Sequence, residues 1–406
     1  MILRCILCVV VLACTSAAAG WVVQDSGTTQ DLHCITANHG NDDEAWACGD
    51  GGVILYTSNG GATWGMQNSG TLSTLYGIVF IENAGAPLVA VGENGTILRT
   101  SNKGATWTLI QSGTVATLYG VTDDHVVGDS GIILRTSDVG LTWIRVPAVT
   151  SQRLRGVSRS TSGLACGDSG VILRRFSDVS NVWNVMPSGT TATLFGIPLF
   201  ANNNLVVGDS GLILRSTDYG TTWSRQASGT VARLHDAQFP TALYDVIYCV
   251  GDGGVILKST NHGTTWGRQQ SGTTRNLQSV FFYIFNDFGW VAGDSGTILR
   301  TTDGGGPIAD VNQGDPHIPA VTSLRQNFPN PFNPTTTIEF SLPHTRFVRL
   351  GVFDISGEEV ATLVSQNLPA GIHHATWNAQ GSPSGIYFYR LQTNSFTETK
   401  KVLLVR

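Results

Sequence analysis

The stretch GDSGIILRTSDVGLTW, residues Gly128–Trp143, decides the fold because it is one copy of a unit that recurs along the chain. Related copies begin at Gly49, Gly92, Gly167, Gly208, Gly251 and Gly293, which makes seven in all. In chain order their first glycines are 43, 36, 39, 41, 43 and 42 residues apart, by subtraction of these residue numbers. A period near forty residues, with several short β-rich runs in each period, is typical of a β-propeller blade.

Each unit contains four short β-rich runs, as the copy at residues 75–110 illustrates. LYGIVFIE and PLVAVG are the first two expected strands, TILRT is the third, and Trp107 opens the fourth, TWTLI. The turn GENG joins the second and third strands, and its glycines can adopt positive φ. The runs are continuously apolar, which fits sheets that neighbouring blades cover on both faces. We therefore predict an all-β protein with a seven-bladed propeller over residues 20–306.

The second turn of each unit has the pattern [S/T]-x-[D/N]-x-G-x-T-W, most complete as STDYGTTW at Ser216–Trp223. This pattern resembles the Asp-box, or BNR repeat, of sialidases and other propellers, in which the boxes lie away from the catalytic site. The Asp or Asn oxygen can accept hydrogen bonds within its own turn, and the Trp can bury apolar surface between blades. We assign a structural role to the box residues Asn59, Asn102, Asp138, Asp178, Asp218, Asn261 and Asp303.

The seventh unit is incomplete, since it ends at Thr301–Gly306 without the Trp and Ser-Gly-Thr typical of the other units. Both features occur near the start of the chain, in GWVVQDSGT at Gly20–Thr28. We therefore predict that this segment forms the outermost strand of the last blade. Such a strand would close the ring and remove an open sheet edge.

Charge and hydropathy restrict the function and the location of the protein. The chain has 24 Lys and Arg against 29 Asp and Glu, so it lacks the basic excess of a nucleic-acid-binding protein. Residues 1–19, MILRCILCVVVLACTSAAA, are typical of a secretory signal peptide that is cleaved after Ala19, and a lipoprotein modified at Cys14 is the alternative. This apolar run is too short to span a membrane, so we expect no transmembrane segment in the mature protein. We also expect a monomer.

Four cysteines follow the leader, at Cys34, Cys48, Cys166 and Cys249. Cys48 and Cys166 occupy equivalent positions in the first and fourth units, too far around the ring to pair. Cys34 and Cys48 fall on adjacent strands of one hairpin, so a disulfide between them stays open, although we favour buried free thiols. The chain has no CxxC or His-rich spacing, so neither a metal site nor a cofactor is expected.

The composition changes after residue 306. Residues 307–323 contain Pro and Gly without periodicity and are expected to be a linker. Residues 324–406 include NFPNPFNPTTTIEFSLP, SGIYFYRL and a Lys-rich apolar end, and their spacing predicts a small immunoglobulin-like β-sandwich of about seven strands. These motifs resemble the C-terminal sorting domain of the type IX secretion system. The resemblance implies export by that machinery, usually with removal of the domain and release or surface attachment.

The seven units resemble the propeller family of the photosystem II stability/assembly factor. The resemblance covers residues 20–306 and rests on the motifs G-[DE]-x-G-x-I-L-[RK]-[ST] and G-x-T-W. It implies a propeller that acts as an assembly scaffold rather than as an enzyme. A photosynthetic role does not follow, because an outer-membrane sorting domain does not suit a thylakoid factor. Unit four departs from the pattern, with Phe176 and Ser180 in place of the box Ser/Thr and Gly.

Two repeated positions bear charged side chains. One is the acidic turn residue, at Asp50, Glu93, Asp129, Asp168, Asp209, Asp252 and Asp294. Its repetition favours turn stabilisation, since catalysis needs one or two distinctive carboxylates. The other is basic in six units and Tyr56 in the first, at Arg99, Arg135, Arg174, Arg215, Lys258 and Arg300. A ring of cations could bind anions, whereas pairing of each cation with a neighbouring carboxylate or carbonyl would explain why nearly every blade has one.

A third position varies between the units. It follows the Leu that begins each first strand, and it holds His33, Tyr76, Tyr119, Arg155, Phe195, His235 and Gln278. The first strand of a blade is innermost, so these side chains should gather near one mouth of the channel. Variation at an otherwise repeated position is typical of a binding surface, and core filling is the alternative.

No catalytic constellation stands out in the sequence, whether an acid pair, a nucleophile with a base or the sialidase arginine triad. His235 and Asp236 are adjacent and should point to opposite faces, and Asp123–His125 fits a hairpin loop. We expect a secreted or cell-surface binding scaffold with an unknown protein or glycan ligand, and not an enzyme. The alternative is a glycoside hydrolase, which would need two carboxylates about 5–10 Å apart at one mouth, from non-repeated acids such as Asp123, Asp236 or Asp245.

Overall fold

The structure is a computed structural model of the 406-residue chain. It describes residues 20–81, 87–158, 163–176, 182–200, 203–239, 245–283, 287–308, 322–342, 346–368, 371–393 and 396–405. The expected leader and most of the expected linker lie outside these ranges. Among the described residues, the model contains no helix with the length and hydropathy needed to cross a bilayer.

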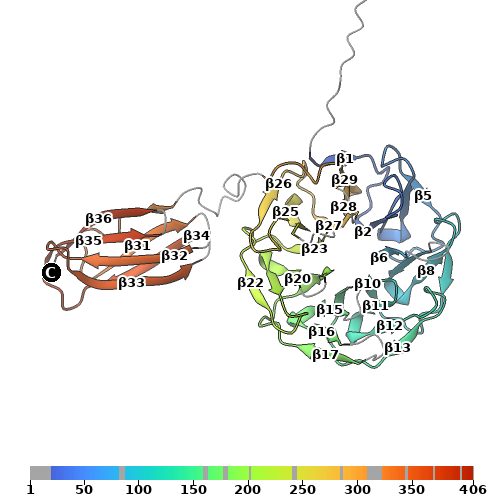
Figure 1. The fold of residues 1–406 in the computed structure, drawn as a ribbon, viewed down its shortest axis with the longest axis horizontal. Coiled ribbons are helices and arrows are strands. Elements are labelled where there is room, and N and C mark those ends of the chain that lie inside the picture. The colour runs from blue at the N-terminus through green and yellow to red at the C-terminus, as the bar shows by residue number, and fades with distance from the viewer. Residues whose placement is uncertain are drawn as a thin grey trace, which may run out of the picture.

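Seven antiparallel sheets form a ring (Figure 1), which confirms the predicted propeller. Blade 1 contains β2 (Leu32–Ala37), β3 (Ala45–Gly49), β4 (Ile54–Thr57) and β5 (Gly65–Gln67). Blade 2 contains β6 (Leu75–Phe80), β7 (Leu88–Gly92), β8 (Ile97–Thr100) and β9 (Thr108–Ile110). Blade 3 contains β10 (Leu118–Val121), β11 (His125–Gly128), β12 (Ile133–Arg135) and β13 (Ile144–Val146). Blade 4 contains β14 (Leu154–Val157), β15 (Leu164–Gly167), β16 (Ile172–Arg175) and β17 (Trp183–Met186).

The remaining blades follow the same plan. Blade 5 contains β18 (Leu194–Gly196), β19 (Leu199–Phe200), β20 (Asn203–Gly208), β21 (Ile213–Ser216) and β22 (Ser224–Gln226). Blade 6 contains β23 (Leu234–Gln238), β24 (Ile247–Gly251), β25 (Val255–Ser259) and β26 (Gly267–Gln269). Blade 7 contains β27 (Leu277–Phe282), β28 (Gly289–Gly293), β29 (Thr297–Thr301) and β1 (Val22–Gln24). The first strands of successive blades contact one another around the ring, so they line its centre.

The N-terminal strand closes the ring as predicted. β1 pairs with β29, and the sheet order is β1-β29-β28-β27, so β1 is the outermost strand of blade 7. Trp21 is buried against the rings of Tyr248 and Phe282, and its Nε1 donates to Gln269 Oε1 at 3.0 Å. The backbone N–H of Gly20 donates to the box carboxylate of Asp303 at 3.0 Å. Trp21 therefore supplies the tryptophan that the seventh unit lacks.

Tight turns between the second and third strands all lie on one face of the ring. Six of them form 3-10 turns, at η1 (Asp50–Gly52), η2 (Glu93–Gly95), η3 (Asp129–Gly131), η4 (Asp168–Gly170), η5 (Asp209–Gly211) and η6 (Asp252–Gly254). Gly52 has φ +73°, and a Cβ there would lie 2.2 Å from the carbonyl oxygen of Thr71. This close approach requires glycine and holds the turn against the segment that leads to the next blade. We call this side of the ring the mouth face and the opposite side, where the boxes lie, the box face.

Apolar side chains fill the spaces between blades. One cluster combines Trp46 and Ile54 of blade 1 with Leu75, Phe80 and Leu88 of blade 2, and similar clusters join the other neighbours. Burial on both faces of each sheet explains the continuously apolar runs in the sequence.

The four cysteines among the described residues are free. Cys34 and Cys48 lie directly opposite each other on β2 and β3, as the sequence suggested, but they form no disulfide. Burial raises the pKa of Cys34 to about 11, and it also raises the pKa values of Cys48, Cys166 and Cys249. The thiols are therefore protonated at neutral pH and act as small apolar groups.

The C-terminal region is a β-sandwich of seven strands, as predicted. One sheet contains β30 (Ser323–Leu324), β31 (Thr335–Leu342) and β34 (Gly371–Asn378). The other has the order β33-β32-β35-β36 and contains β32 (Arg346–Phe353), β33 (Glu359–Leu368), β35 (Gly385–Gln392) and β36 (Thr397–Leu404). The two sheets enclose one apolar core that includes Phe340, Trp377 and Tyr389.

Candidate ligand-binding mouth

Each variable residue sits in a β-bulge at the start of the first strand of its blade. In blade 1 the pairing passes from Leu32 opposite Gly49 to Cys34 opposite Cys48, so His33 has no partner across the ladder. The same irregularity occurs in all seven blades. A bulge leaves one residue unpaired and changes the direction of its side chain. The sequence did not reveal these bulges, because they depend on the register between strands.

The bulged side chains meet the acidic turn residues of their own blades. Five of the seven form hydrogen bonds there: His33–Asp50 (2.8 Å), Tyr76–Glu93 (3.5 Å), Arg155–Asp168 (2.6 Å), His235–Asp252 (2.7 Å) and Gln278–Asp294 (2.7 Å). The repeated acids therefore hold variable side chains in place at the mouth, in addition to forming the turn. This role was not part of the sequence-based interpretation.

Six of the seven candidates also contact one another in blade order. The ring centroids of His33 and Tyr76 are 5.0 Å apart, and those of Tyr76 and Tyr119 are also 5.0 Å apart. The Arg155 guanidinium lies 5.8 Å from the Tyr119 centroid and 5.0 Å from that of Phe195, which is 5.5 Å from the His235 ring. We call these six residues the mouth belt. They are partly buried, so they pack against each other and still present surface to solvent.

The tyrosines of the belt remain protonated across the physiological pH range. Burial, aided by the Glu93 carboxylate, raises the pKa of Tyr76 to about 12. Burial, aided by Asp129, also raises the pKa of Tyr119. The O–H of Tyr76 already donates to Glu93, whereas the O–H of Tyr119 can donate to a carbonyl, carboxylate or sugar oxygen of a ligand.

Two further arginines, which the sequence analysis did not identify, pack against the mouth belt. Arg153 Nε bonds Asp129 Oδ1 of the preceding blade at 2.6 Å, and its guanidinium lies 5.2 Å from the Tyr119 centroid. Arg233 Nε likewise bonds Asp209 Oδ1 at 2.7 Å and lies 5.2 Å from the Phe195 centroid. Each arginine directly precedes the Leu that begins the first strand of its blade. A positive charge two residues before the variable position was the only sequence feature that could have identified it.

The charges around the mouth are unequal. Arginines pair with the turn acids of blades 3, 4 and 5, through Arg153, Arg155 and Arg233. The turn acids of blades 1, 2, 6 and 7 instead bond to His, Tyr or Gln side chains. Ion pairs therefore compensate one side of the mouth, while the other side is richer in negative charge.

The box face repeats one local arrangement. The Asp218 carboxylate accepts hydrogen bonds from Thr222 N (2.9 Å) and Thr222 Oγ1 (2.6 Å), which lower its pKa to about 2. The corresponding oxygen accepts a backbone N–H in the boxes of Asn59, Asn102, Asp138, Asn261 and Asp303. Asp178 lies outside the described residues. These contacts support a structural role for the boxes.

The repeated basic residues reach the box of the next blade. Arg99 Nε donates to the carbonyl of Val139 at 2.8 Å, and Lys258 Nζ donates to that of Gly304 at 3.1 Å. Arg174 and Arg300 also donate to the next box, while Arg135 and Arg215 occupy equivalent positions. This contact accounts for the repetition of the position without an anion ligand.

Blade 1 also contacts the box of the next blade, but here blade 1 supplies the acidic residue and the next box supplies the cation. Tyr56 takes the basic position, and its hydroxyl bonds the buried Glu44 at 3.1 Å. Lys103 from the next box pairs with the same carboxylate at 2.6 Å. The hydrogen bonds from Lys103, Asn38 and Tyr56 lower the pKa of Glu44 despite its burial.

The three non-repeated acids named as possible catalytic groups do not come together. Asp123 lies in the hairpin loop between β10 and β11, as expected. The backbone carbonyl of Asp245 accepts a hydrogen bond from the backbone N–H of box residue His262 at 2.9 Å, and its carboxylate lies 2.9 Å from His262 Nε2, so Asp245 lies on the box face. Asp236 lies on the channel wall and accepts hydrogen bonds from Ser279 Oγ (3.1 Å) and Val280 N (3.0 Å) of the next blade. Burial raises the pKa of Asp236 to about 6.

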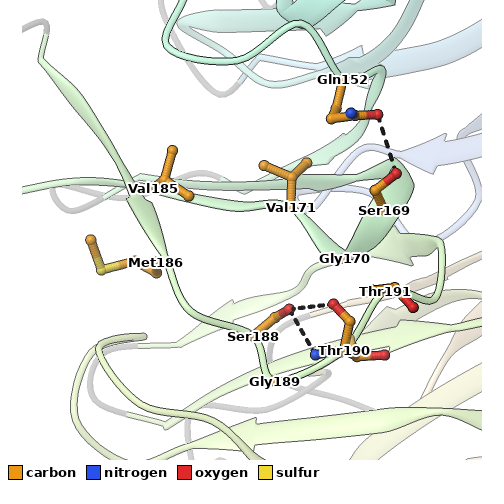
Figure 2. A pocket seen from close by; sticks show the side chains of 10 residues that line it. All are labelled: Gln152, Ser169, Gly170, Val171, Val185, Met186, Ser188, Gly189, Thr190 and Thr191. Atoms are coloured by element: carbon orange, nitrogen blue, oxygen red, sulfur yellow. Dashed lines mark hydrogen bonds between the residues drawn. The ribbon is translucent and has the colours of Figure 1, made fainter.

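Shallow grooves lie beside the Ser-Gly-Thr turns. The groove in blade 4, with a volume of about 740 Å³, is lined by residues such as Ser169, Val171 and Met186 (Figure 2). A groove of about 560 Å³ occupies the equivalent position in blade 6. Both grooves lie beside the repeated Ser-Gly-Thr turn, so neither has the variation between blades that distinguishes the mouth belt.

Comparison with known proteins separates the two parts of the chain. No curated protein matches the sequence. The solved structure of YCF48 from Cyanidioschyzon merolae is similar, with a TM-score of 0.57, 18% identity and coverage of 70% of this chain and 98% of that chain. A structure described as YCF48 bound to D1 peptide has a TM-score of 0.57 and 18% identity, and covers 71% of this chain and 99% of that chain. Residues 326–405 match the family described as secretion system C-terminal sorting domain.

Both expected resemblances are therefore confirmed, the first at the level of the fold. The sorting domain indicates export to the cell exterior and an interaction with the secretion machinery. The first part of the chain is similar in fold to YCF48, and residues 326–405 match the family described as secretion system C-terminal sorting domain.

Proposed function

We propose that this protein is a secreted or cell-surface binding module whose propeller holds a protein or glycan ligand at the mouth face. The observation that supports this most is the series of seven bulges, which direct seven side chains of five residue types to one mouth. A stable ring alone needs no such variation, since the opposite face uses nearly the same contacts in every blade. Residues that differ at a repeated, partly exposed position are suited to the recognition of one ligand.

Exposed apolar side chains on the same face favour a protein ligand over a glycan. Leu72, Val115 and Val231 are 89%, 87% and 69% exposed, the highest values among the large apolar side chains described in the propeller. All three follow the Ser-Gly-Thr turns that pack against the turns of the mouth face, as the contact of Gly52 with Thr71 illustrates. A propeller of the same fold has been solved with a D1 peptide bound, so this architecture is able to bind a peptide.

Export is proposed to use two signals. The leader at residues 1–19 would direct the chain across the inner membrane, with cleavage after Ala19, and the C-terminal domain would direct it across the outer membrane. Removal of residues 324–406 should leave a folded propeller and abolish delivery to the cell exterior. Export of the truncated protein by a host with type IX secretion would contradict this part of the proposal.

The glycoside hydrolase alternative gains no support from the named acids. Asp236 contacts the next blade on the channel wall, whereas Asp245 lies on the box face. The turn acids at the mouth are mostly bonded to neighbouring side chains and repeat in every blade. We therefore propose binding without catalysis.

The binding proposal is tested with two aromatic residues of adjacent blades. The double variant Tyr76→Ala/Tyr119→Ala removes two neighbouring rings of the mouth belt, and Tyr219→Ala removes a 50% exposed ring from the box face. Immobilised wild-type and variant proteins are compared for capture of surface proteins and for binding to a glycan array. The mouth variant should lose at least about tenfold in affinity for any ligand found, because each aromatic contact contributes roughly 1 kcal/mol. Equal binding by the double variant at matched stability would place the site elsewhere.

A further inference from the structure

The four-stranded sheet of the sorting domain has one face turned away from the core. Along β35, Tyr387, Tyr389 and Leu391 are buried, whereas the alternate residues lie on the opposite side. The neighbouring strands alternate in the same way, with Val348, Leu350 and Val352 of β32 inside, and Val402 and Leu404 of β36 inside. The outer face of this sheet should therefore be polar if it only meets water.

Apolar side chains nevertheless gather at one end of this outer face. Ile386 of β35 is 42% exposed and lies directly opposite Leu403 of β36, which is 36% exposed. Phe388 is the next residue of β35 after Ile386 that faces outward. It lies opposite Phe353 of β32, and both Phe side chains are partly exposed. Adjacent exposed apolar residues on a sheet face are a feature of interaction surfaces.

Cations surround this apolar patch. Lys401 of β36 lies directly opposite Phe388 and forms no ion pair with any residue in the described part of the chain. Arg390 lies over the Phe353 ring at 4.7 Å and bonds Thr399 Oγ1 at 3.2 Å, rather than a carboxylate. Among the described cations of this face, only Arg349 has an acidic partner, Glu359, at 2.7 Å. The face therefore combines apolar groups with an excess of positive charge.

The edge of the same sheet is already covered near the patch. The backbone of Phe332 exchanges hydrogen bonds with Leu403 and Val405 of the C-terminal strand segment, at 3.0 and 3.1 Å. The side chains of Gln326 and Asn330 bond the backbone of Lys401 and Leu403. The NFPNPFNP segment, residues 327–334, thus occupies the position of an added strand along β36, so a partner cannot pair with this edge and the outer face is a surface that stays available beside it.

We propose that this outer face, defined by Phe353, Ile386, Phe388, Leu403 and Lys401, is the docking surface for an apolar, acidic segment of the export machinery. The inference rests on the proposed export function and specifies the surface responsible for it. The apolar patch excludes water from the contact, and the carboxylates of the partner meet Lys401 and Arg390. This charge complementarity determines which partner chemistry fits.

The test uses matched substitutions in the full-length chain. Ile386→Thr/Leu403→Thr reduces the apolar patch with a residue that favours strands. The control Ile372→Thr makes the same type of change at a 53% exposed residue of β34, which belongs to the other sheet. Lys401→Glu reverses the charge at an exposed position without altering the core. For each variant, the fraction of protein outside the cell is measured in a host with type IX secretion, together with the thermal melt of the purified full-length protein.

The outcomes distinguish this inference from the proposed function. We expect the Ile386/Leu403 variant and Lys401→Glu each to reduce export by roughly tenfold or more, with unchanged melts and normal export of the control. Normal export of both face variants, in a host that fails to export the chain lacking residues 324–406, would overturn the docking surface alone. Normal export of the truncated chain would contradict the export function itself. If the double variant has a lower thermal midpoint than wild type, the test relies on Lys401→Glu alone. Normal export of Lys401→Glu would then overturn the inference.

Discussion

The two faces of the propeller are built from the same seven units, yet they differ in how strictly those units repeat. On the box face, the same carboxylate or amide oxygen binds the same turn in each described blade, and a cation from the preceding blade often reaches it. On the mouth face, a repeated bulge and a repeated acid hold a different side chain in nearly every blade. Repetition therefore accompanies structural contacts, whereas variation occurs on the face that we propose binds a ligand.

This difference explains why residues of the mouth belt can be substituted without unfolding the propeller. The bulged residue has no partner across the ladder, so its identity does not determine strand pairing. Although the belt residues also contact one another between blades, further contacts that join the blades lie in the boxes, the inter-blade core and the closing strand. Substitutions that weaken contacts between blades should therefore lower stability, whereas substitutions in the mouth belt should affect binding.

Deletion of residues 20–28 should destabilise the whole ring. It removes buried Trp21 and β1, and truncation of a buried Trp alone costs about 3–5 kcal/mol. The thermal midpoint of the deletion variant is compared with wild type and with Val23→Ala, a control for a 57% exposed residue in the same strand. Equal midpoints for the deletion variant and wild type would show that β1 does not close the ring.

Asp236→Ser should change how stability depends on pH. The folded-state pKa of Asp236 is about 6, above its ordinary value of 3.8, so its contribution to stability is present below about pH 4 and is lost as pH rises through 6. The unfolding free energy of wild type relative to the variant should therefore fall by about 2–3 kcal/mol between pH 4 and pH 8. Denaturant titrations at several pH values measure this difference. A constant difference would mean that the carboxyl does not titrate in this range.

Asp218→Ala should cost about 1–2 kcal/mol of stability without weakening ligand binding, because it removes hydrogen bonds within one box. The pKa of Asp218 is lowered to about 2, so its stabilising effect should be present above about pH 4 and decline as pH falls toward 2. Asp218→Asn is the matched control, since Asn occupies this position in three boxes. Loss of binding without any change in the melt would assign a functional role to the box.

The sequence predicted the blades, the closing strand and the sandwich, because each depends on local apolar patterns and on repetition. It also placed the variable residues at one mouth. It could not reveal the bulge at His33 and its equivalents, which depends on the register between β2 and β3. It also missed Arg153 and Arg233, because only the assembled ring brings them to acids of the preceding blade.

The box cations show the same limit on local reasoning. The sequence identified Arg99 and Lys258 as members of a repeated set, but their partners are carbonyls about forty residues away. The exchange of charge between Glu44 and Lys103 in blade 1 likewise depends on contact between neighbouring blades. Long-range pairing of this kind follows from the ring geometry and has no local pattern in the chain.

Site-specific photo-crosslinking tests most directly whether the mouth face is the binding face. A photoactivatable phenylalanine analogue is placed at Tyr119 in the mouth belt or at Tyr219 on the box face, in the full-length secreted protein. Both proteins are irradiated on cells, and the crosslinked products are compared after their melts have been matched. Our interpretation predicts a discrete crosslinked partner from position 119 and none from position 219. A partner crosslinked from position 219 alone would contradict it.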